Sequence, residues 1–546
     1  MRDGYDAIII GSGHNGLVAA AYLARAGWRV AVLERNAVAG GCIATEELTV
    51  PGYRHDTMSS WHPLFHLSAA WAELGTELGA HGLRYANSEE TVAASAMGDG
   101  RVLLVDRDPA HTVEQFTGAD QRAYLAAYES FGAHAEAVGA LMGAELHSLH
   151  GVRLAAALTR RLRRRGSLAF GAQMLWSARS WLATDFEGRE AADLLAPWVL
   201  HTGLSPDAAG GGFQALAIAA TLHQVGLPVV RGGADGFVHA FTRLIESHGG
   251  EVICNSEVER IVVRGGRAAG VIAGGSELTA RRSVIANVTP PQLYGRLLLA
   301  GDAPPAAREQ AARYRFNPRA GMQIHLALSQ PPRWRDERLA AAPIVHLTDG
   351  LDGVSLACAQ ATCGLLPARP TIVCGQQTVL DPERAPDGGA IIWIQLQEVP
   401  FRPRGDAAGE IDVGDGEWTQ ALTDAYTQRI LARLAEWIEN LDEVVVGRAV
   451  LPPPELERRN CNLVGGDIYA GDAELDQSYL WRPLPGYGSH ATPVADLYQC
   501  GASTFPGPGL NASSGRTAAG LALAAHGDEL GARLARTARR AVAIVR

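Results

Sequence analysis

Apolar runs near the start of the chain predict two buried parallel strands with a helix between them. Residues 7–10 read Ala-Ile-Ile-Ile, a continuous apolar run of the kind found in strands covered on both faces. Residues 17–26 are rich in Ala and Leu, which predicts a helix, and Gly27 is expected to end it. Residues 28–33 then predict the second strand. This order is typical of an α/β nucleotide-binding fold.

Three later stretches have other periodicities and predict a second, mixed domain. Residues 321–329 and 390–399 alternate in the manner of half-buried strands. Residues 418–441 predict one amphipathic helix. The apolar positions of that helix recur at helical spacing: Leu422, Tyr426, Ile430, Leu434, Trp437 and Leu441. Together these elements predict a sheet with helices packed on one face.

The turn after the first strand carries three glycines at the spacing of a dinucleotide-binding motif. Gly11 permits the tight turn, Gly13 lets the backbone approach a pyrophosphate, and Gly16 lets the helix pack on the strand. Glu34 closes the second strand 18 residues after Gly16, where an acid is expected to bind ribose hydroxyls. An acid there would repel the 2′-phosphate of NADP. The turn therefore predicts NAD or FAD.

Two further segments distinguish FAD from NAD. The pair Gly40-Gly41 follows Glu34 by six residues, and a plain NAD domain has no use for it. Residues 497–525 read as a strand, a Gly/Pro-rich turn and an Ala-rich helix. Both segments resemble the FAD-binding signatures of amine oxidases, phytoene desaturases and their relatives. Residues 465–501 resemble more closely the phytoene dehydrogenase-like and β-carotene ketolase-like branch.

The resemblance implies FAD as the cofactor and assigns a set of residues to it. The helix after the C-terminal turn would offer its N-terminus to the flavin's pyrimidine carbonyl. The backbone of Val258 would contact adenine. The expected cofactor-binding residues are Gly11, Gly13, His14, Asn15, Gly16, Glu34, Arg35, Gly40, Gly41, Cys42, Val258, Gly501, Ala502, Leu510, Asn511 and Ala512. The chain departs from the family at three positions, with Ala512 and Ser514 in place of Gly and Pro, and Cys42 where Arg is common.

The motif-bearing blocks alternate with stretches that lack nucleotide motifs, which predicts two interleaved domains. We expect a discontinuous, glutathione reductase-like α/β domain of Rossmann type that binds FAD, and an α+β substrate domain that caps the flavin. The FAD-binding domain would comprise residues 1–88, 229–292 and 456–546. The substrate domain would comprise residues 89–228 and 293–455.

Residues 53–66, which follow the glycine pair, are expected to pass near the isoalloxazine ring. A base there would remove a proton as hydride leaves the neighbouring carbon. We take His62 as the candidate base, with Ser60 in the same catalytic set; the alternative is a histidine held in the structure by a hydrogen bond. Asp56 is expected to hold the turn. Cys42 either lies against the flavin, where it tunes or covalently binds it, or is only a small side chain that fits.

Composition and charge narrow the chemistry further. All 48 basic residues counted as Lys plus Arg are Arg, which excludes a lysine Schiff base and the lysine-held water common in amine oxidases. The net charge of -10 argues against a general nucleic-acid binder. The seven cysteines are scattered without a CxxC pair, so no metal site or disulfide framework is expected. The segment TRRLRRRG at 159–166 is either a solvated helix face or a contact for anionic lipid or phosphate.

A single GxGxxG unit means that reduced flavin must give its electrons to dioxygen, a quinone or another protein. We expect an FAD-dependent dehydrogenase or desaturase that acts on a small hydrophobic or secondary-metabolite substrate. Alternatives are a flavin-dependent amine oxidase, a carotenoid-type isomerase that uses reduced FAD without net redox, and a flavin-stabilised partner protein. With no apolar run near 18 residues and a first strand at about residue 5, a cytoplasmic protein is expected, with peripheral membrane contact left open. Oligomeric state stays open.

Overall fold

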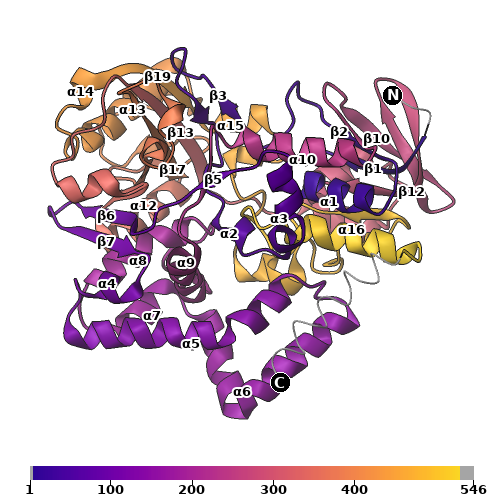
Figure 1. The fold of residues 1–546 in the computed structure, drawn as a ribbon, viewed down its shortest axis with the longest axis horizontal. Helices are drawn as coiled ribbons and strands as arrows, with labels where there is room; N and C mark the ends of the chain where they lie inside the picture. The colour runs from indigo at the N-terminus through magenta and orange to yellow at the C-terminus, as the bar shows by residue number, and fades with distance from the viewer. Residues whose placement is uncertain (1–3, 529–546) are drawn as a thin grey trace.

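The computed structural model describes residues 4–528, which form two large sheets with helices around them. The nucleotide-side sheet has the order β10-β11-β12-β1-β2-β9, with β20 paired to β12, and lies at the right of Figure 1. Its strands are β1 (Gly4–Ile10), β2 (Val30–Leu33), β9 (Glu251–Ile253), β10 (Val258–Arg264), β11 (Arg267–Ala273), β12 (Ser276–Ala286) and β20 (Leu497–Gln499). Segments from the start, middle and end of the chain therefore share one sheet, as predicted for a discontinuous domain.

The first strand is buried on both faces, as its continuous apolar run predicts. β1 lies between β12 and β2 and pairs with both in parallel. Ala7 and Ile9 pack into one core, and Ile8 and Ile10 pack into the other. Three helices cover the Ala7 face: α1 (His14–Arg25), α10 (Asp235–Ser247) and α16 (Ser513–Ala525).

The substrate-side sheet has the order β19-β13-β17-β16-β14-β6-β7, and helices cover both of its faces. Its strands are β6 (Thr91–Met97), β7 (Val102–Asp106), β13 (Ala320–Leu328), β14 (Ile344–Thr348), β16 (Ile372–Gly375), β17 (Ala390–Val399) and β19 (Val445–Leu451). Ile392 and Ile394 of β17 pack against α13 (Gln420–Ala435), whereas Trp393 packs against α8 (Glu190–Leu200) and α9 (Gly211–Val225). The prediction of helices on one face was therefore wrong. β13 is likewise buried along its whole length and not half-buried.

The amphipathic helix predicted for 418–441 is shorter in the structure. α13 begins after the cap Thr419 and ends at Ala435. Trp437 and Leu441 lie beyond this helix but still pack into the core that it covers. Apolar spacing continued past the helix end because the following turn and α14 (Leu441–Val444) face the same core.

The predicted domain boundaries fall between strands of different sheets. The boundary at 88 separates β5 (Tyr85–Ala86) from β6, and that at 228 precedes β8 (Val229–Val230). The other two, at 292 and 455, cut the helical segments Pro291–Leu297 and Pro453–Arg459.

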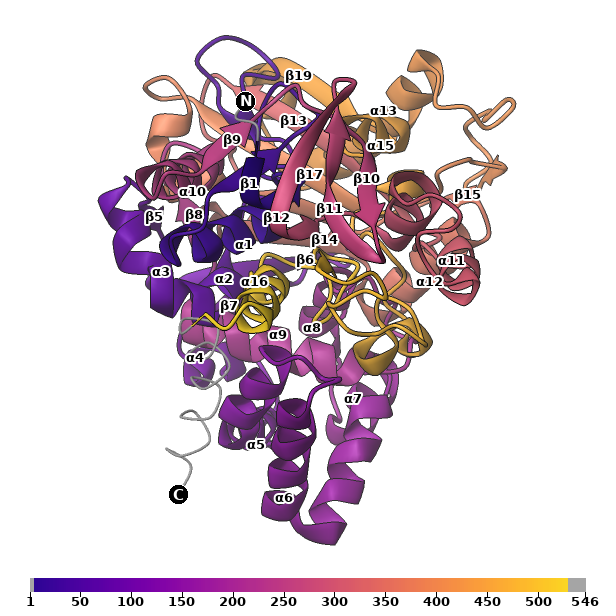
Figure 2. The same cartoon turned by 90° about the vertical axis from the view of Figure 1, so that its right-hand side faces the viewer.

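Two long helices form an arm that projects away from both sheets. α5 (Gly118–Met142) and α6 (Leu149–Leu175) run out from the body at the bottom of Figures 1 and 2. α6 contains the arginine-rich segment and bends at Arg163, whose φ is 56°. The connection between α5 and α6 is attached to the body, because the Glu145 carboxylate accepts a hydrogen bond from His490 Nδ1 at 2.8 Å.

A buried ionic network joins the two halves of the molecule. The Arg384 guanidinium contacts Asp56 at 2.6 Å and Asp381 at 3.0 Å, and it donates to the Val230 carbonyl at 2.7 Å. Asp56 also accepts from the Ala234 main-chain N–H at 2.9 Å. Asp56 thus holds its turn, as predicted, and ties it to both halves.

Candidate active site

The nucleotide turn has the geometry that its glycines predict. Gly11 has a φ of +89°, a left-handed conformation that favours glycine. A Cβ at Gly16 would lie 2.2 Å from the Gly11 carbonyl oxygen, so only glycine lets α1 approach β1 this closely. Gly13 caps α1 without any side-chain hydrogen bond, and no acidic residue lies in the first turn. The N-terminus of α1 is therefore open to an anion such as a pyrophosphate.

Glu34 is 5% exposed, and it is organised by a serine that the sequence analysis passed over. Its Oε2 accepts from the Ser12 main-chain N–H at 3.0 Å and from Ser12 Oγ at 2.7 Å. Ser12 Oγ in turn accepts from the Gly40 N–H at 2.9 Å. The second residue of the motif therefore links the ribose-binding acid to the glycine pair. Its hydroxyl inside the turn was the signal that could have revealed it.

The glycine pair lies against the nucleotide turn. Gly40 has a φ of +127°, and a Cβ there would lie 2.2 Å from the Ile43 carbonyl oxygen. A Cβ at Gly41 would lie 3.1 Å from Gly13 Cα. Any side chain at this pair would therefore displace the backbone around the turn.

The C-terminal turn meets the N-terminal one at the start of α16. The Gly515 N–H donates to Asn15 Oδ1 at 3.0 Å, and a Cβ at Gly515 would lie 2.1 Å from the Asn15 carbonyl oxygen. Ala512, the cap of α16, has a φ of +61°, a region that explains the glycine of the related families. Ser514 uses the hydroxyl that proline lacks, because its Oγ accepts from the Gly501 N–H at 3.0 Å.

Asn287 connects the two cofactor motifs and was also missed. Its Nδ2 donates to the carbonyl oxygens of Gly11 at 3.4 Å and Gly13 at 3.3 Å. A Cβ at Gly501 would lie 2.7 Å from Asn287 Oδ1. Asn287 follows β12, so its position at the carboxyl end of a strand beside β1 was the available signal.

The remaining predicted cofactor residues lie around the same edge. The Ser256 N–H donates to the Glu34 carbonyl at 2.8 Å, which brings the segment that leads into Val258 beside the ribose-binding acid. Arg35 is exposed. His14 lies beside Asn15, with 2.9 Å between its Nε2 and Asn15 Nδ2, and burial lowers its pKa to about 4. A neutral His14 in the turn agrees with a structural role.

A cavity of about 650 Å³ joins the cofactor motifs to the substrate-side domain. On the nucleotide side it is lined by Cys42, Ser59, Ser60 and residues 506–511. On the substrate side its walls come from α5, α8, α9 and β17, and they are mainly apolar. The side chains that line this part of the cavity include Phe131, Met142, Trp198, His201, Trp393, Gln395 and Gln397.

Ser60 lines this cavity, but His62 is not among its lining residues. The fully buried His62 ring packs edge-on against Phe237, and its Nδ1 lies 2.9 Å from the Tyr85 hydroxyl. Burial lowers the pKa of His62 to about 3. This geometry favours a structural histidine over the predicted base, because the ring points into the core. Ser60 Oγ donates to Asp56 at 2.5 Å, so this hydroxyl too is engaged in structure.

His201 is the histidine that the structure places on the cavity wall, among the described residues. It follows α8, and its Nε2 lies 3.0 Å from Nε2 of the buried His346. Burial lowers the pKa of His201 to about 4, so the imidazole is neutral near pH 7. The sequence carries no motif around His201, so only the fold could reveal it.

Cys42 lies where the glycine pair meets the cavity. Asn460 Nδ2 donates to its Sγ at 3.3 Å, and burial raises the pKa of the thiol. A thiol held protonated is a poor nucleophile, which favours the interpretation of Cys42 as a small side chain that fits.

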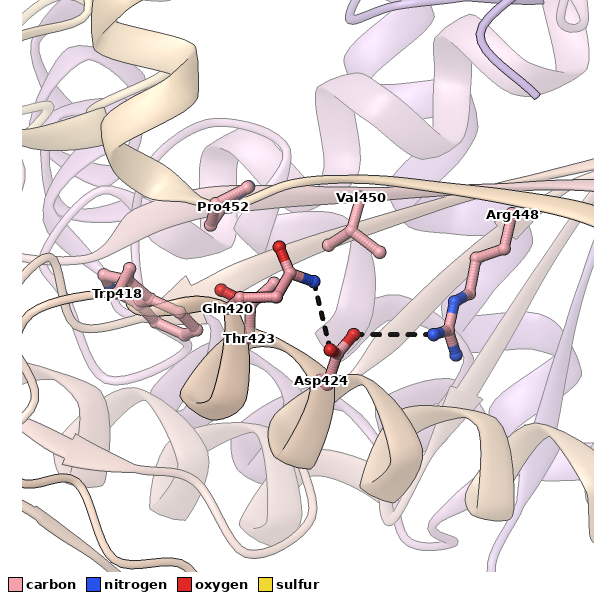
Figure 3. A pocket seen from close by; sticks show the side chains of 7 residues that line it. All are labelled: Trp418, Gln420, Thr423, Asp424, Arg448, Val450 and Pro452. Carbon is pink, nitrogen blue, oxygen red and sulfur yellow. Dashed lines mark hydrogen bonds and ion pairs between the residues drawn. The ribbon is translucent and has the colours of Figure 1, made fainter.

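A second hollow, of about 300 Å³, lies between α13 and β19. Its polar groups satisfy one another: Gln420 donates to Asp424 at 3.0 Å, and Arg448 donates to Asp424 at 3.4 Å (Figure 3). It is on the face of the sheet covered by α13, away from the cofactor motifs, so it is not the active site.

The residues present fit FAD. Gly13 leaves a cradle in which a Cβ would approach Asn287 Nδ2 to 2.9 Å, beside the uncapped N-terminus of α1. Glu34 supplies a buried carboxylate for ribose, and the glycine pair leads from it to the cavity. These features define a two-domain flavin-dependent oxidoreductase.

Comparisons with known proteins agree. Residues 9–75 match the NAD(P)-binding Rossmann-like domain. The chain is 28% identical over 558 residues to the rat pyridine nucleotide-disulfide oxidoreductase domain-containing protein 2, covering 95% of this chain and 93% of the relative. It is 25% identical to one of the subunits of limonene dehydrogenase from Castellaniella defragrans, covering 94% and 93%. The fold is similar to that of putrescine oxidase, with a TM-score of 0.58, 16% identity and coverage of 96% and 99%.

These findings confirm the predicted resemblance, fold class and cofactor. The chain is an FAD-dependent oxidoreductase with a Rossmann-like α/β domain and a second α+β domain. Its sequence is similar to that of a hydroxyneurosporene desaturase, and its fold is similar to that of amine oxidases.

Proposed function

We propose that the protein dehydrogenates a small hydrophobic molecule held in the 650 Å³ cavity. The observation that carries this proposal is that one cavity is shared by Cys42 and the 506–511 turn on one side and by apolar walls on the other. FAD supplies hydride acceptance at N5, and dioxygen, a quinone or a protein acceptor would reoxidise it. The similarity to limonene dehydrogenase supports a hydrophobic substrate.

His201 would take the proton that the substrate loses as its hydride leaves. The two-electron oxidation then balances, with hydride to the flavin and a proton to the imidazole. His201 is neutral at pH 7, lies on the wall and is oriented by His346. The apolar walls would exclude water from the reacting carbon.

Anaerobic mixing of the holoenzyme with candidate substrates tests the function. Bleaching of the flavin band supports dehydrogenation, and bleaching by amines alone would favour the amine oxidase alternative. Unbleached conversion by pre-reduced enzyme would favour an isomerase. His201→Gln should slow bleaching about 10²- to 10⁴-fold while FAD stays bound, and His62→Gln should not. Equal effects of the two variants would contradict the role of His201.

We also propose that the α5–α6 arm touches an anionic membrane surface, from which an apolar substrate could enter. α6 exposes Leu149, Val152, Leu168 and Leu175 together with five arginines in the segment 159–166. Within residues 4–528, no helix has the length and apolar character needed to cross a membrane. Co-flotation with phosphatidylglycerol vesicles, lost when the five arginines become Gln, would support the contact. Absence of co-flotation at low salt would contradict it.

A further inference from the structure

No carboxylate side chain occurs among the described residues that line the 650 Å³ cavity. Neither Asp nor Glu occurs among its lining residues, whereas Arg482 and Arg516 do. The Glu73 carboxylate neutralises Arg516 through contacts of 2.6 and 2.9 Å. A buried ammonium ion would find no opposite charge on this wall, and desolvation of an unpaired ion is strongly unfavourable.

Arg482 makes the binding of a cation in the cavity still less favourable. Its side chain is 1% exposed, and no acidic side chain of the described residues forms an ion pair with it. Its guanidinium donates instead to main-chain oxygens, those of Ala502 at 2.8 and 3.0 Å and Asp472 at 2.9 Å, with a longer contact to Gln477 at 3.4 Å. Main-chain carbonyl groups bind the Arg482 guanidinium without neutralising it, so its positive charge remains beside the C-terminal cofactor turn.

The wall does offer a hydrogen-bond donor on β17. Gln395 is the partly exposed position of a strand that is otherwise buried, and it lines the cavity. Gln397, on the same face and 4% exposed, donates from Nε2 to Gln395 Oε1 at 3.2 Å. That bond occupies the Gln395 oxygen and fixes its amide, so the Gln395 N–H groups are left for a ligand. The same side of β17 carries Trp393, whose indole N–H has no hydrogen-bond acceptor among residues 4–528.

We propose that the cavity selects an uncharged apolar molecule with one oxygen acceptor, a ketone or an alcohol, held by the Gln395 amide. Gln397 acts as the positioning residue. This inference rests on the proposed function only in assigning the cavity to the substrate. It distinguishes the protein from enzymes that must hold an ammonium group, and from those whose substrates are pure hydrocarbons.

A matched ligand series tests the proposal in the holoenzyme. Decan-2-one, decan-2-ol, decan-2-amine and decane share a chain and differ only in the polar group. Binding is measured through perturbation of the oxidised flavin spectrum under conditions without turnover. The ketone and the alcohol should bind about tenfold or more tightly than the amine, and about 3- to 10-fold more tightly than decane, the worth of one hydrogen bond.

Two substitutions locate the effect. Gln395→Leu should remove the preference for the ketone over decane, and Gln395→Glu, which keeps the shape and adds a carboxylate, should turn the preference toward the amine. Gln420→Glu makes the same chemical change on α13, outside the cavity, and should alter neither ratio. FAD content is checked for each variant.

Two results would overturn the proposal: amine binding at least as tight as ketone binding in the unmodified protein, or an unchanged ketone-to-decane ratio in Gln395→Leu. The first needs no variant and so does not depend on folding of any mutant. Because the readout is binding to oxidised enzyme, a failure of dehydrogenation would appear separately, as ligands that bind but do not bleach the flavin.

Discussion

The nucleotide side and the substrate side of this molecule depend on different kinds of information. On the nucleotide side, the site is formed by closely packed main chain, because Gly16 must lie against the Gly11 carbonyl and Gly41 against Gly13. On the substrate side, the site is a set of side chains from α5, α8, α9 and β17 around a cavity. Such backbone contacts restrict both residue type and spacing, so they produce a motif that can be recognised in the sequence. A cavity wall requires only apolar residues of fitting size.

The largest effect is expected from the addition of one methyl group to the nucleotide turn. Gly16→Ala would place a Cβ 2.2 Å from the Gly11 carbonyl oxygen, so α1 must move away from β1 and FAD binding should be lost. Gly301→Ala, where the added Cβ meets nothing within 4 Å, is the matched control. Flavin absorbance per protein after purification is the measurement. Full FAD occupancy in Gly16→Ala would show that the turn is not constrained as described.

The ionic network between the two halves should have the next largest effect. Arg384→Met leaves Asp56 and Asp381 buried without their cation, which should lower the free energy of unfolding by about 3–5 kcal/mol. Urea denaturation followed by tryptophan fluorescence measures the change. Arg402→Met, at an exposed pair with Glu417, should change it by less than about 1 kcal/mol. Equal losses in the two variants would contradict a special role for the buried network.

A substitution of Glu34 should affect FAD binding on the nucleotide side alone. Glu34→Ala removes the acceptor for ribose and for Ser12, and should weaken FAD binding by about 1–3 kcal/mol, or about 5- to 150-fold. Fluorescence titration of apoprotein with FAD gives the affinity. The exposed neighbour Glu47→Ala is the control. Unchanged affinity in Glu34→Ala would count against the ribose assignment.

A substitution of His62 should have the smallest effect, a change in how the free energy of unfolding depends on pH. The native pKa of about 3 lies below the ordinary value of about 6.5, so the unfolded chain takes up a proton first as pH falls. The contribution of neutral His62 to stability is thus present above pH 6.5 and is lost progressively between about 6.5 and 3. His62→Gln should reduce this loss in urea denaturation at pH 7 and 5. An identical pH dependence in the variant would contradict the burial of a neutral ring.

The sequence predicted most of the nucleotide side because each feature there is local. Gly11, Gly16 and Gly40 have backbone geometry that favours glycine, and Glu34 is buried directly after β2. The roles of Ser12 and Asn287 could not be predicted, because they depend on contacts between segments that are distant in the sequence. Ser12 binds Gly40, and Asn287 contacts both cofactor motifs.

On the substrate side, the sequence predicted elements but not their arrangement. The alternation along β17 predicts one buried face, yet Trp393 and Ile394 face two different cores. The position of His62 after the glycine pair predicts a place near the flavin, but its ring packs against Phe237. His201 and Gln395 reach the cavity only through packing of distant segments, which no spacing along the chain reveals.

The assignment of FAD to this protein is tested by identifying the bound nucleotide. Purified protein is denatured by heat, the supernatant is separated by liquid chromatography, and the released nucleotide is identified by its absorbance and mass. We expect a yellow protein that releases FAD in equimolar amount. A colourless protein that takes up NAD and shows no affinity for FAD would contradict it.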